Sequence, residues 1–291
     1  MPLALGAYVL PGDPVWLRSS LERYYPFVDR LVVPVPDNGL GWNGRPIRVQ
    51  ECLSVVREVD VRGIISVVTG QWTDSRDPLS QDTAQRRAAV AALADMDWIL
   101  QIDNDELLPS MPILRSYIEQ AHGAGLAAVE WPMRVLFRRS SGSYLEVCSS
   151  DMSPHYEYPG PIAIRSDVTL VEARRIDGSF LRLGVHGDDS SLQLTRPPEE
   201  REERLMTLRL EDAIIHNSWA RSPASVWSKV QSWGHATGFS KVGYYAAVWL
   251  PAPATWPLLR NFHPLSRPLW PRLRRSDGPG DLLSEDERFH L

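Results

Sequence analysis

The chain has 291 residues, of which 43% are hydrophobic and 23% are charged, and its formal net charge is −5. This ordinary globular composition excludes a disordered or fibrous chain, and no stretch approaches the roughly 20 consecutive apolar residues of a membrane-spanning helix. Cys52 and Cys148 have neither metal-binding nor disulfide spacing, which favours a reducing, cytoplasmic location. The first residues lack a basic leader and a cleavage site, so we expect residues 3–10 to form a buried strand.

The first 110 residues alternate short apolar runs with helical patterns. Strands are predicted over residues 3–10, 30–36, 63–70 and 98–103. Helices are predicted from Pro14 onward, over about 47–59 and over about 81–94. Asp13 is expected to cap the first helix, with Pro14 as its first residue. This alternation predicts an α/β fold with a mainly parallel sheet flanked by helices.

The fourth predicted strand runs directly into the acidic sequence Asp103-Asn104-Asp105-Glu106. Ligands of open parallel sheets bind beyond the carboxyl ends of the strands, so we expect these carboxylates to face a crevice. Two carboxylates separated by one residue can reach a common divalent cation, and oxygen ligands suit Mg²⁺ or Mn²⁺. The alternative is a solvated acidic turn that caps the following helix.

The pattern changes after a further predicted helix over residues 111–125. Strands are predicted over residues 126–139, 161–165, 169–175 and 179–185, without helices between them, which indicates a mixed or antiparallel extension. Residues 195–204 are predicted to be a polar loop or a helix start, and residues 210–220 to hold a last strand before a helix over 222–236. We therefore predict one domain over 1–240, divided into a nucleotide-binding half, 1–110, and an acceptor half, 111–240.

Residues 241–291 are predicted to form an irregular tail rich in Pro, Trp and Arg. Between Ala213 and Ser276 there is no Asp or Glu, whereas eight Lys or Arg and six of the eleven tryptophans lie there. Tryptophan and arginine together favour an anionic membrane surface as a partner, so the protein is expected to be cytoplasmic and able to associate peripherally with the inner face of the membrane. The alternative is a carboxyl-terminal wrap in which Trp256 and Trp270 fill gaps on the domain. No nucleic-acid partner is expected, because the chain is acidic and lacks a recognition motif.

Two stretches carry a resemblance to a known family. The stretch AQRRAAVAALADMDWILQIDNDELL, residues 84–108, resembles the segment of family-2-like GT-A glycosyltransferases in which a helix with an early Arg precedes a Trp-bearing strand and an Asp-x-Asp-Glu motif. The stretch AIIHNSWARS, residues 213–222, followed by Lys229, resembles the carboxyl-terminal histidine segment of bacterial lipopolysaccharide-core-type sugar transferases. By order of elements the resemblance covers roughly residues 3–236. It implies a GT-A-like Rossmann-type fold with an acceptor-side extension.

The resemblance implies a metal-dependent transfer of sugar from a nucleotide-diphosphate sugar to a hydroxyl of a glycan, a lipid-linked or a small-molecule acceptor. Asp103 would contact the nucleotide ribose or the metal, while Asp105 and His216 would bind Mn²⁺ or Mg²⁺. Glu106 would support the loop. Arg86 would contact the diphosphate, and Lys229 belongs to the same donor site.

Local sequence also allows simpler roles for several of these residues. His216 could be purely structural, and Arg86 could be a surface arginine paired with Asp82 four residues earlier. Trp72 and Asp74 follow the third strand, so they could contact the nucleoside or merely belong to a polar loop.

An inverting transfer needs a carboxylate with a near-neutral pKa to accept the proton of the acceptor hydroxyl. The candidates are Asp188 and Asp189, which lie between the two motifs, and Glu130, which lies inside an apolar strand. A retaining mechanism would need no such base. Two other classes stay open: a nucleotidyltransferase or phosphohydrolase that uses the same carboxylates, and a non-catalytic peripheral membrane protein.

Overall fold

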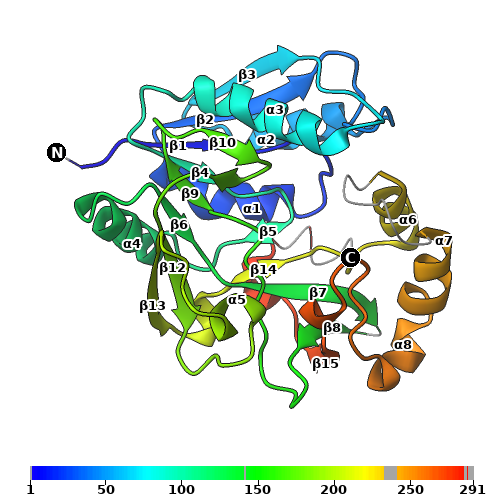
Figure 1. Cartoon of the computed structure of the whole chain (residues 1–291). Coiled ribbons are helices and arrows are strands. Elements are labelled where there is room, and N and C mark those ends of the chain that lie inside the picture. The colour runs from blue at the N-terminus through cyan, green and yellow to red at the C-terminus, as the bar shows by residue number, and fades with distance from the viewer. Residues whose placement is uncertain (1, 141, 233–240, 285–286, 288–291) are drawn as a thin grey trace.

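The structure is a computed structural model that describes residues 2–140, 142–232, 241–284 and 287. Within these ranges, eight strands form one sheet in the order β13-β12-β6-β9-β4-β1-β2-β3 (Figure 1). Their bounds are β1 Leu5–Tyr8, β2 Arg30–Pro36, β3 Ile65–Gly70, β4 Trp98–Gln101, β6 Ala128–Glu130, β9 Ala163–Arg165, β12 Phe180–Val185 and β13 Glu202–Leu208.

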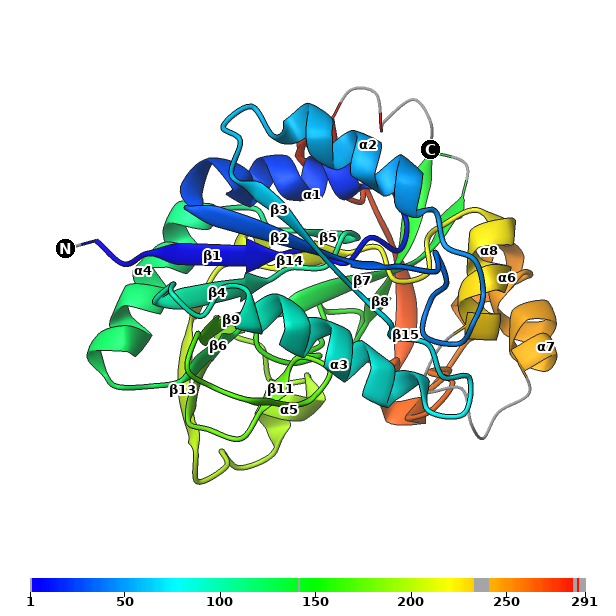
Figure 2. The same ribbon diagram turned by 90° about the horizontal axis from the view of Figure 1, so that it is seen from above.

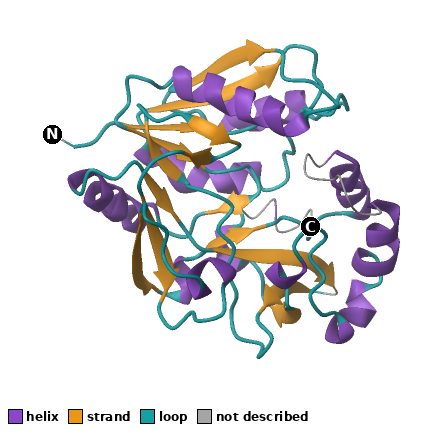
Figure 3. Cartoon of the chain, viewed as in Figure 1, coloured by secondary structure: helices purple, strands orange, loops and turns teal. Residues whose placement is uncertain are grey.

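The amino-terminal half of this sheet is parallel. β1 pairs in parallel with both β2 and β4, and β2 pairs in parallel with β3. The helices α1 Leu17–Tyr24 and α2 Val49–Val59 cover one face and α3 Pro78–Ala91 covers the other (Figures 2 and 3). Because both faces are covered, every residue of β1 and β4 is buried, which explains why their sequences are apolar apart from Gln101. The predicted α/β class with a mainly parallel sheet is confirmed.

Helix starts follow local capping chemistry. Asp77 caps α3 by accepting a hydrogen bond from the Ser80 N–H, and Ser110 caps α4 Met111–Gly123 by accepting one from the Ile113 N–H. The predicted cap at Asp13 is wrong. Its carboxylate accepts a hydrogen bond from the Val15 N–H in a turn that precedes the helix, and α1 begins only at Leu17.

The rest of the large sheet is mixed. β9 lies antiparallel between β4 and β6, and β12 pairs in parallel with β6 and with β13. The predicted strand over 126–139 is two strands, because Pro132 lacks the N–H that a ladder needs and the chain changes sheet there. The predicted strand over 169–175 is a hairpin of β10 Leu170–Glu172 and β11 Arg175–Ile176. Residues 195–204 were predicted to be a polar loop or a helix start. In the structure the short helix α5 Leu192–Thr195 ends where this segment begins, and β13 starts at Glu202 near its end.

A second sheet brings the two motifs of the sequence together. Among the described residues it has the order β15-β8-β7-β14-β5, with bounds β5 Glu106–Leu107, β7 Met133–Ser140, β8 Ser143–Cys148, β14 Ile214–His216 and β15 Arg272–Ser276. β5 and β14 pair antiparallel, and His216 is the register partner of Glu106. β14 was predicted to be the last strand, which is wrong because β15 pairs with β8.

The carboxyl-terminal segment packs against the second sheet. It contains α6 Pro223–Ser232, α7 Lys241–Tyr244, a π-helical turn Tyr245–Trp249 and α8 Ala252–Thr255. Trp249 and Trp270 are buried in a cluster with Phe137 of β7, and Trp256 packs against that cluster. These tryptophans therefore fill the core between the tail and β7, as the wrap interpretation predicts. None of the helices in the described part of the chain combines the length and apolar character needed to cross a bilayer.

Candidate functional site

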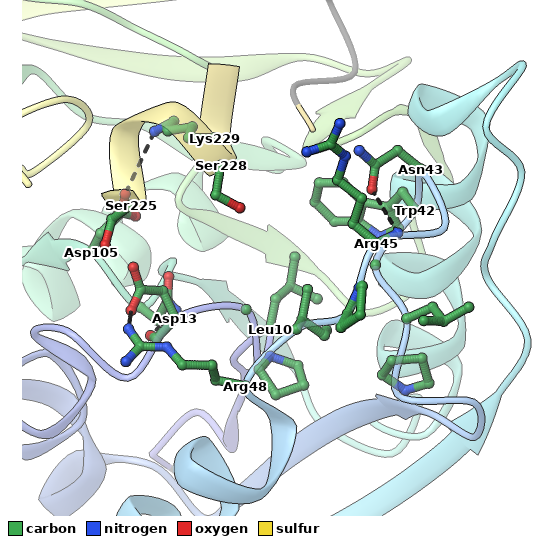
Figure 4. A pocket seen from close by; sticks show the side chains of 18 of the residues that line it. Leu10, Asp13, Trp42, Asn43, Arg45, Arg48, Asp105, Ser225, Ser228 and Lys229 are labelled. Atoms are coloured by element: carbon green, nitrogen blue, oxygen red, sulfur yellow. Dashed lines mark hydrogen bonds and ion pairs between the residues drawn. The ribbon is translucent and has the colours of Figure 1, made fainter. Parts of the chain in front are cut away.

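A cavity of about 670 Å³ lies at the carboxyl edge of the parallel half of the sheet. Residues that follow β1, β2, β3 and β4 all line it, and the opposite wall comes from Arg221 and α6. Figure 4 shows Trp42 and Arg45 of the loop after β2 across the cavity from Ser225 and Lys229 of α6. The cavity is lined by five residues of the site predicted from the sequence: Arg86, Asp103, Asp105, Trp72 and Lys229. The position agrees with the rule that ligands bind beyond the carboxyl ends of parallel strands.

Asp103 forms a two-pronged ion pair with Arg86. Its carboxylate oxygens lie 3.1 and 3.2 Å from the two terminal nitrogens of Arg86, whose Nε donates to Asp82 at 2.7 Å. Arg86 therefore does pair with Asp82, but as a buried side chain instead of a surface one. Burial alone raises the pKa of Asp103, but Arg86 and Arg174 outweigh it and hold the pKa below its ordinary value.

Asp105 faces three basic side chains. Its Oδ2 accepts a hydrogen bond from Arg221 and lies 3.6 Å from Nε2 of His216 and 4.0 Å from Nζ of Lys229. Burial alone raises the pKa of Asp105, but these neighbours, Arg221 foremost, bring it well below its ordinary value. The pairing of β5 with β14 places His216 here, although His216 is not among the described residues that line the cavity.

Glu106 does not face the cavity, so the expectation that all the carboxylates of the motif line a crevice is wrong for this residue. Its side chain is fully buried and accepts hydrogen bonds from both terminal nitrogens of Arg174, at 2.5 and 2.8 Å. Its Oε2 also accepts a hydrogen bond from the backbone N–H of Asp103 at 3.0 Å. Glu106 therefore fixes the turn that carries Asp103 and Asp105.

Asp13 joins the site from the end of β1. Its Oδ2 lies 2.8 Å from Nη1 of Arg221, and its Oδ1 accepts a hydrogen bond from Arg48. Its backbone carbonyl accepts a hydrogen bond from the Asn104 amide, which ties the first strand end to the acidic motif. No local pattern indicated this role, since both arginines come from distant segments.

The predicted metal ligands do not fit a divalent cation in this arrangement. Both oxygens of Asp103 accept hydrogen bonds from Arg86, and Oδ2 of Asp105 contacts Arg221. Across the residues that the structure describes, no group of three His, Cys, Asp or Glu side chains is placed to hold a metal ion. The Mn²⁺ or Mg²⁺ ion stays a prediction.

Cations outnumber carboxylates in the cavity. The described lining holds five basic side chains, Arg45, Arg48, Arg86, Arg221 and Lys229, against three carboxylates, Asp13, Asp103 and Asp105. The formal excess of two positive charges favours an anionic ligand. Burial, with a contribution from Arg221, lowers the pKa of Lys229 to about 8. The ammonium of Lys229 donates hydrogen bonds to the backbone and side chain of Ser218.

Two tryptophans give the cavity an aromatic component. Trp72 follows β3 and is buried, and Trp42 lies in the loop after β2, where its indole N–H donates to Gln85 at 2.6 Å. Sequence reasoning missed the loop over residues 40–48, although it follows a parallel strand just as the acidic motif does. Asp74 is not among the described lining residues, and its carboxylate accepts hydrogen bonds from the backbone N–H and side chain of Arg76.

The three candidate bases lie outside the described lining of the cavity. Glu130 is buried against Arg182, with Oε2 2.8 Å from Nε, and burial raises its pKa although Arg182 opposes the shift. Asp188 accepts hydrogen bonds from the backbone N–H groups of Ser190 and Ser191, and Asp189 is exposed. The structure therefore does not bring Glu130, Asp188 or Asp189 to the acidic motif. The low pKa values of Asp103 and Asp105 also make these two poor proton acceptors.

No protein-family model and no curated protein sequence matches this chain. Among solved structures, 4-diphosphocytidyl-2C-methyl-D-erythritol synthase from Anaerococcus prevotii aligns over 57% of this chain and 73% of its own, with 10% identity and a TM-score of 0.30. Mannose-1-phosphate geranyltransferase from Thermus thermophilus aligns over 50% of this chain and 49% of its own, with 15% identity and a TM-score of 0.28. Alignments at these TM-scores do not establish a common fold or activity. The fold assignment therefore rests on the strand order, and the family-2 resemblance stays a prediction.

Proposed function

We propose that this protein is a glycosyltransferase that binds a nucleotide-diphosphate sugar in the cavity and transfers the sugar to a hydroxyl group. The acceptor would be a glycan, a lipid-linked or a small molecule. The observation that carries the proposal is the cavity at the ends of four parallel strands, where an acidic motif, an excess of cations and two tryptophans meet. Its volume of about 670 Å³ falls within the range of small-molecule sites.

The lining supplies complementary chemistry for each part of such a donor. Arg48, Arg221 and Lys229, called here the cation cluster, would hold the diphosphate, because guanidinium and ammonium groups donate strong hydrogen bonds to phosphate oxygens. Trp42 and Trp72 would pack against the nucleoside, since every base offers a face for stacking.

In the transfer, the bond between the anomeric carbon and the diphosphate oxygen breaks, and the nucleoside diphosphate leaves with the electron pair. The acceptor oxygen forms the new bond, and its proton passes to an oxygen of the departing diphosphate. The negative charge that develops on the leaving oxygen would be stabilised by the cation cluster.

A nucleotidyltransferase or phosphohydrolase is the second candidate, because the same cations could hold a phosphoryl group under attack. The products separate the candidates. Sugar transfer releases a nucleoside diphosphate, whereas nucleotidyl transfer releases pyrophosphate from a nucleoside triphosphate, and a phosphohydrolase releases inorganic phosphate. The experiment incubates the protein with a panel of nucleotide sugars and triphosphates and identifies the released anion by chromatography. Release of nucleoside diphosphate from a nucleotide sugar supports the proposal, and pyrophosphate release from a triphosphate contradicts it.

We further propose that the tail contacts an anionic membrane surface, which would suit a lipid-linked acceptor. Leu258 and Val242 are 80% and 60% exposed, and Leu250 and Leu265 are also exposed, in a region without acidic residues. The wild-type protein should co-sediment with vesicles of anionic phospholipid, and Leu258→Asp should reduce the fraction of protein that co-sediments. Val171→Asp is the matched control, since Val171 is 49% exposed and lies on β10. Equal pelleting with neutral vesicles would contradict the proposal.

A further inference from the structure

We infer that Arg221, together with Arg48 and Lys229, holds the diphosphate of the ligand without a divalent cation. The inference rests on the proposed function and specifies how the same cavity binds its anion. It departs from the metal site that the acidic motif predicts, because the structure places a guanidinium where a shared ion would be needed.

Arg221 connects the ends of two parallel strands. Its Nη1 donates to Oδ2 of Asp13 at 2.8 Å, its Nη2 donates to Oδ2 of Asp105, and its Nε donates to the backbone carbonyl of Asn217 at 3.1 Å. Only 10% of its side chain is exposed. A divalent ion shared by the acids at these strand ends would have to displace Arg221 from both carboxylates.

The other acid of the motif that lines the cavity, Asp103, is also paired. Arg86 binds both oxygens of Asp103, and 5% of the Arg86 side chain is exposed. The carboxylates that could attract a metal are therefore balanced by cations from this chain. Displacing a buried cation from its partner leaves an uncompensated charge, which opposes metal binding.

The same cations face the cavity that an anionic ligand would enter. A guanidinium carries five N–H groups, and the three contacts of Arg221 described above engage three of them. Arg221, Arg48 and Lys229 all line the cavity, and 46% of the Arg48 side chain and 23% of the Lys229 side chain are exposed. A diphosphate bound between these groups would be attracted by the excess positive charge, because the lining has more basic side chains than carboxylates.

The test is calorimetry with UDP, GDP, ADP and CDP, each in EDTA and again in Mn²⁺. We expect the nucleotide that binds to do so in EDTA, with an affinity within about threefold of that in Mn²⁺, a difference below the tenfold that 1.4 kcal/mol represents. Binding only in Mn²⁺ would overturn the inference and leave the proposed function standing. Absence of binding by every nucleotide in both conditions would instead overturn the proposed function.

The variant Arg221→Gln separates the cation from the metal explanation. We expect it to weaken binding in EDTA by about tenfold or more and to make binding responsive to Mn²⁺, because Asp13 and Asp105 lose their guanidinium. The double variant Arg221→Gln with Asp105→Asn removes one positive and one negative charge together. It replaces the single variant in the binding experiment if the single variant does not fold. It should also bind weakly in EDTA. Arg260→Gln, in the tail outside the described lining, is the control and should bind as the wild type does. Unchanged binding of both Arg221 variants in EDTA would refute the inference.

Discussion

Nε2 of His216 lies 3.6 Å from Oδ2 of Asp105, although the two residues belong to segments far apart in the sequence. The contact arises because β14 pairs antiparallel with β5, which makes Glu106 and His216 register partners. Next to this pair, Asn217 donates its backbone N–H to the carbonyl of Asp105 at 2.8 Å. The second sheet thus joins the acidic motif to the segment that carries Arg221 and α6, and the cavity depends on this connection.

Removal of the Arg221 guanidinium should destabilise the fold as well as the site. Arg221→Gln leaves Asp13 and Asp105 without their shared partner, and breaking such a buried pair costs roughly 3–5 kcal/mol. Urea denaturation should report this loss. Arg201→Gln is the control, because its pair with Asp177 is exposed on both sides and should contribute less than about 1 kcal/mol. Equal urea midpoints for Arg221→Gln and Arg201→Gln would show that the ion pairs of Arg221 with Asp13 and Asp105 do not stabilise the fold.

Diphosphate binding should weaken as Lys229 loses its proton. Because the pKa of Lys229 is lowered to about 8, its ammonium is largely charged near pH 7 and largely neutral above about pH 9. Calorimetry across this range should show falling affinity with rising pH. Lys229→Arg keeps the charge, so its affinity should change little over the same range. A wild-type profile as flat as that of Lys229→Arg would exclude Lys229 as an anion ligand.

Acid should destabilise the protein through the motif. The folded pKa values of Asp103 and Asp105 are lowered, so both carboxylates contribute stability that is fully present above the unfolded value of about 3.9. That contribution is lost as the pH falls through the folded values. Thermal melts at decreasing pH should therefore show a steep loss of stability below about pH 4. Asp105→Asn should make the loss less steep, and an identical slope would indicate that the ion pairs of Asp105 do not stabilise the fold.

Trp42, one of the two tryptophans that line the cavity, should contribute to nucleotide affinity. If Trp42 stacks on the base, Trp42→Leu should weaken nucleotide binding by roughly 1–3 kcal/mol, while pyrophosphate, which has no base, should bind unchanged. Trp42→Phe should retain part of the affinity. Trp256→Leu, in the tail outside the described lining, is the control. Equal losses for nucleotide and pyrophosphate would mean that Trp42 supports the cavity without contacting a base.

The parallel half of the fold could be predicted because its strands are buried on both faces. Continuous apolar runs such as Leu31 to Val33 are recognisable without any alignment, and the acidic motif at the end of β4 follows from the same reasoning. β15 was missed because its sequence, Arg272–Ser276, is basic and lies at the edge of the second sheet. The edge strand β13 likewise begins inside a run of charged residues.

The partners of the acidic motif could not be predicted, because ion pairs depend on contacts between distant segments. Arg174 reaches Glu106 from the β10–β11 hairpin, and Arg221 reaches Asp105 from the turn before α6. A signal for the loop after β2 did exist. It follows a parallel strand and holds Trp42, Arg45 and Arg48, so the rule that located Asp103 applies to it equally.

Diphosphate binding in the cavity is tested most directly by equilibrium binding of a panel of nucleoside diphosphates to the wild-type protein and to Lys229→Glu. We expect saturable binding of at least one nucleoside diphosphate to the wild type. Charge reversal at Lys229 should abolish that binding, because the cavity then loses its excess of positive charge. Absence of saturable binding to the wild type, or equal binding to a folded Lys229→Glu variant, would contradict the proposal that this cavity binds a nucleoside diphosphate.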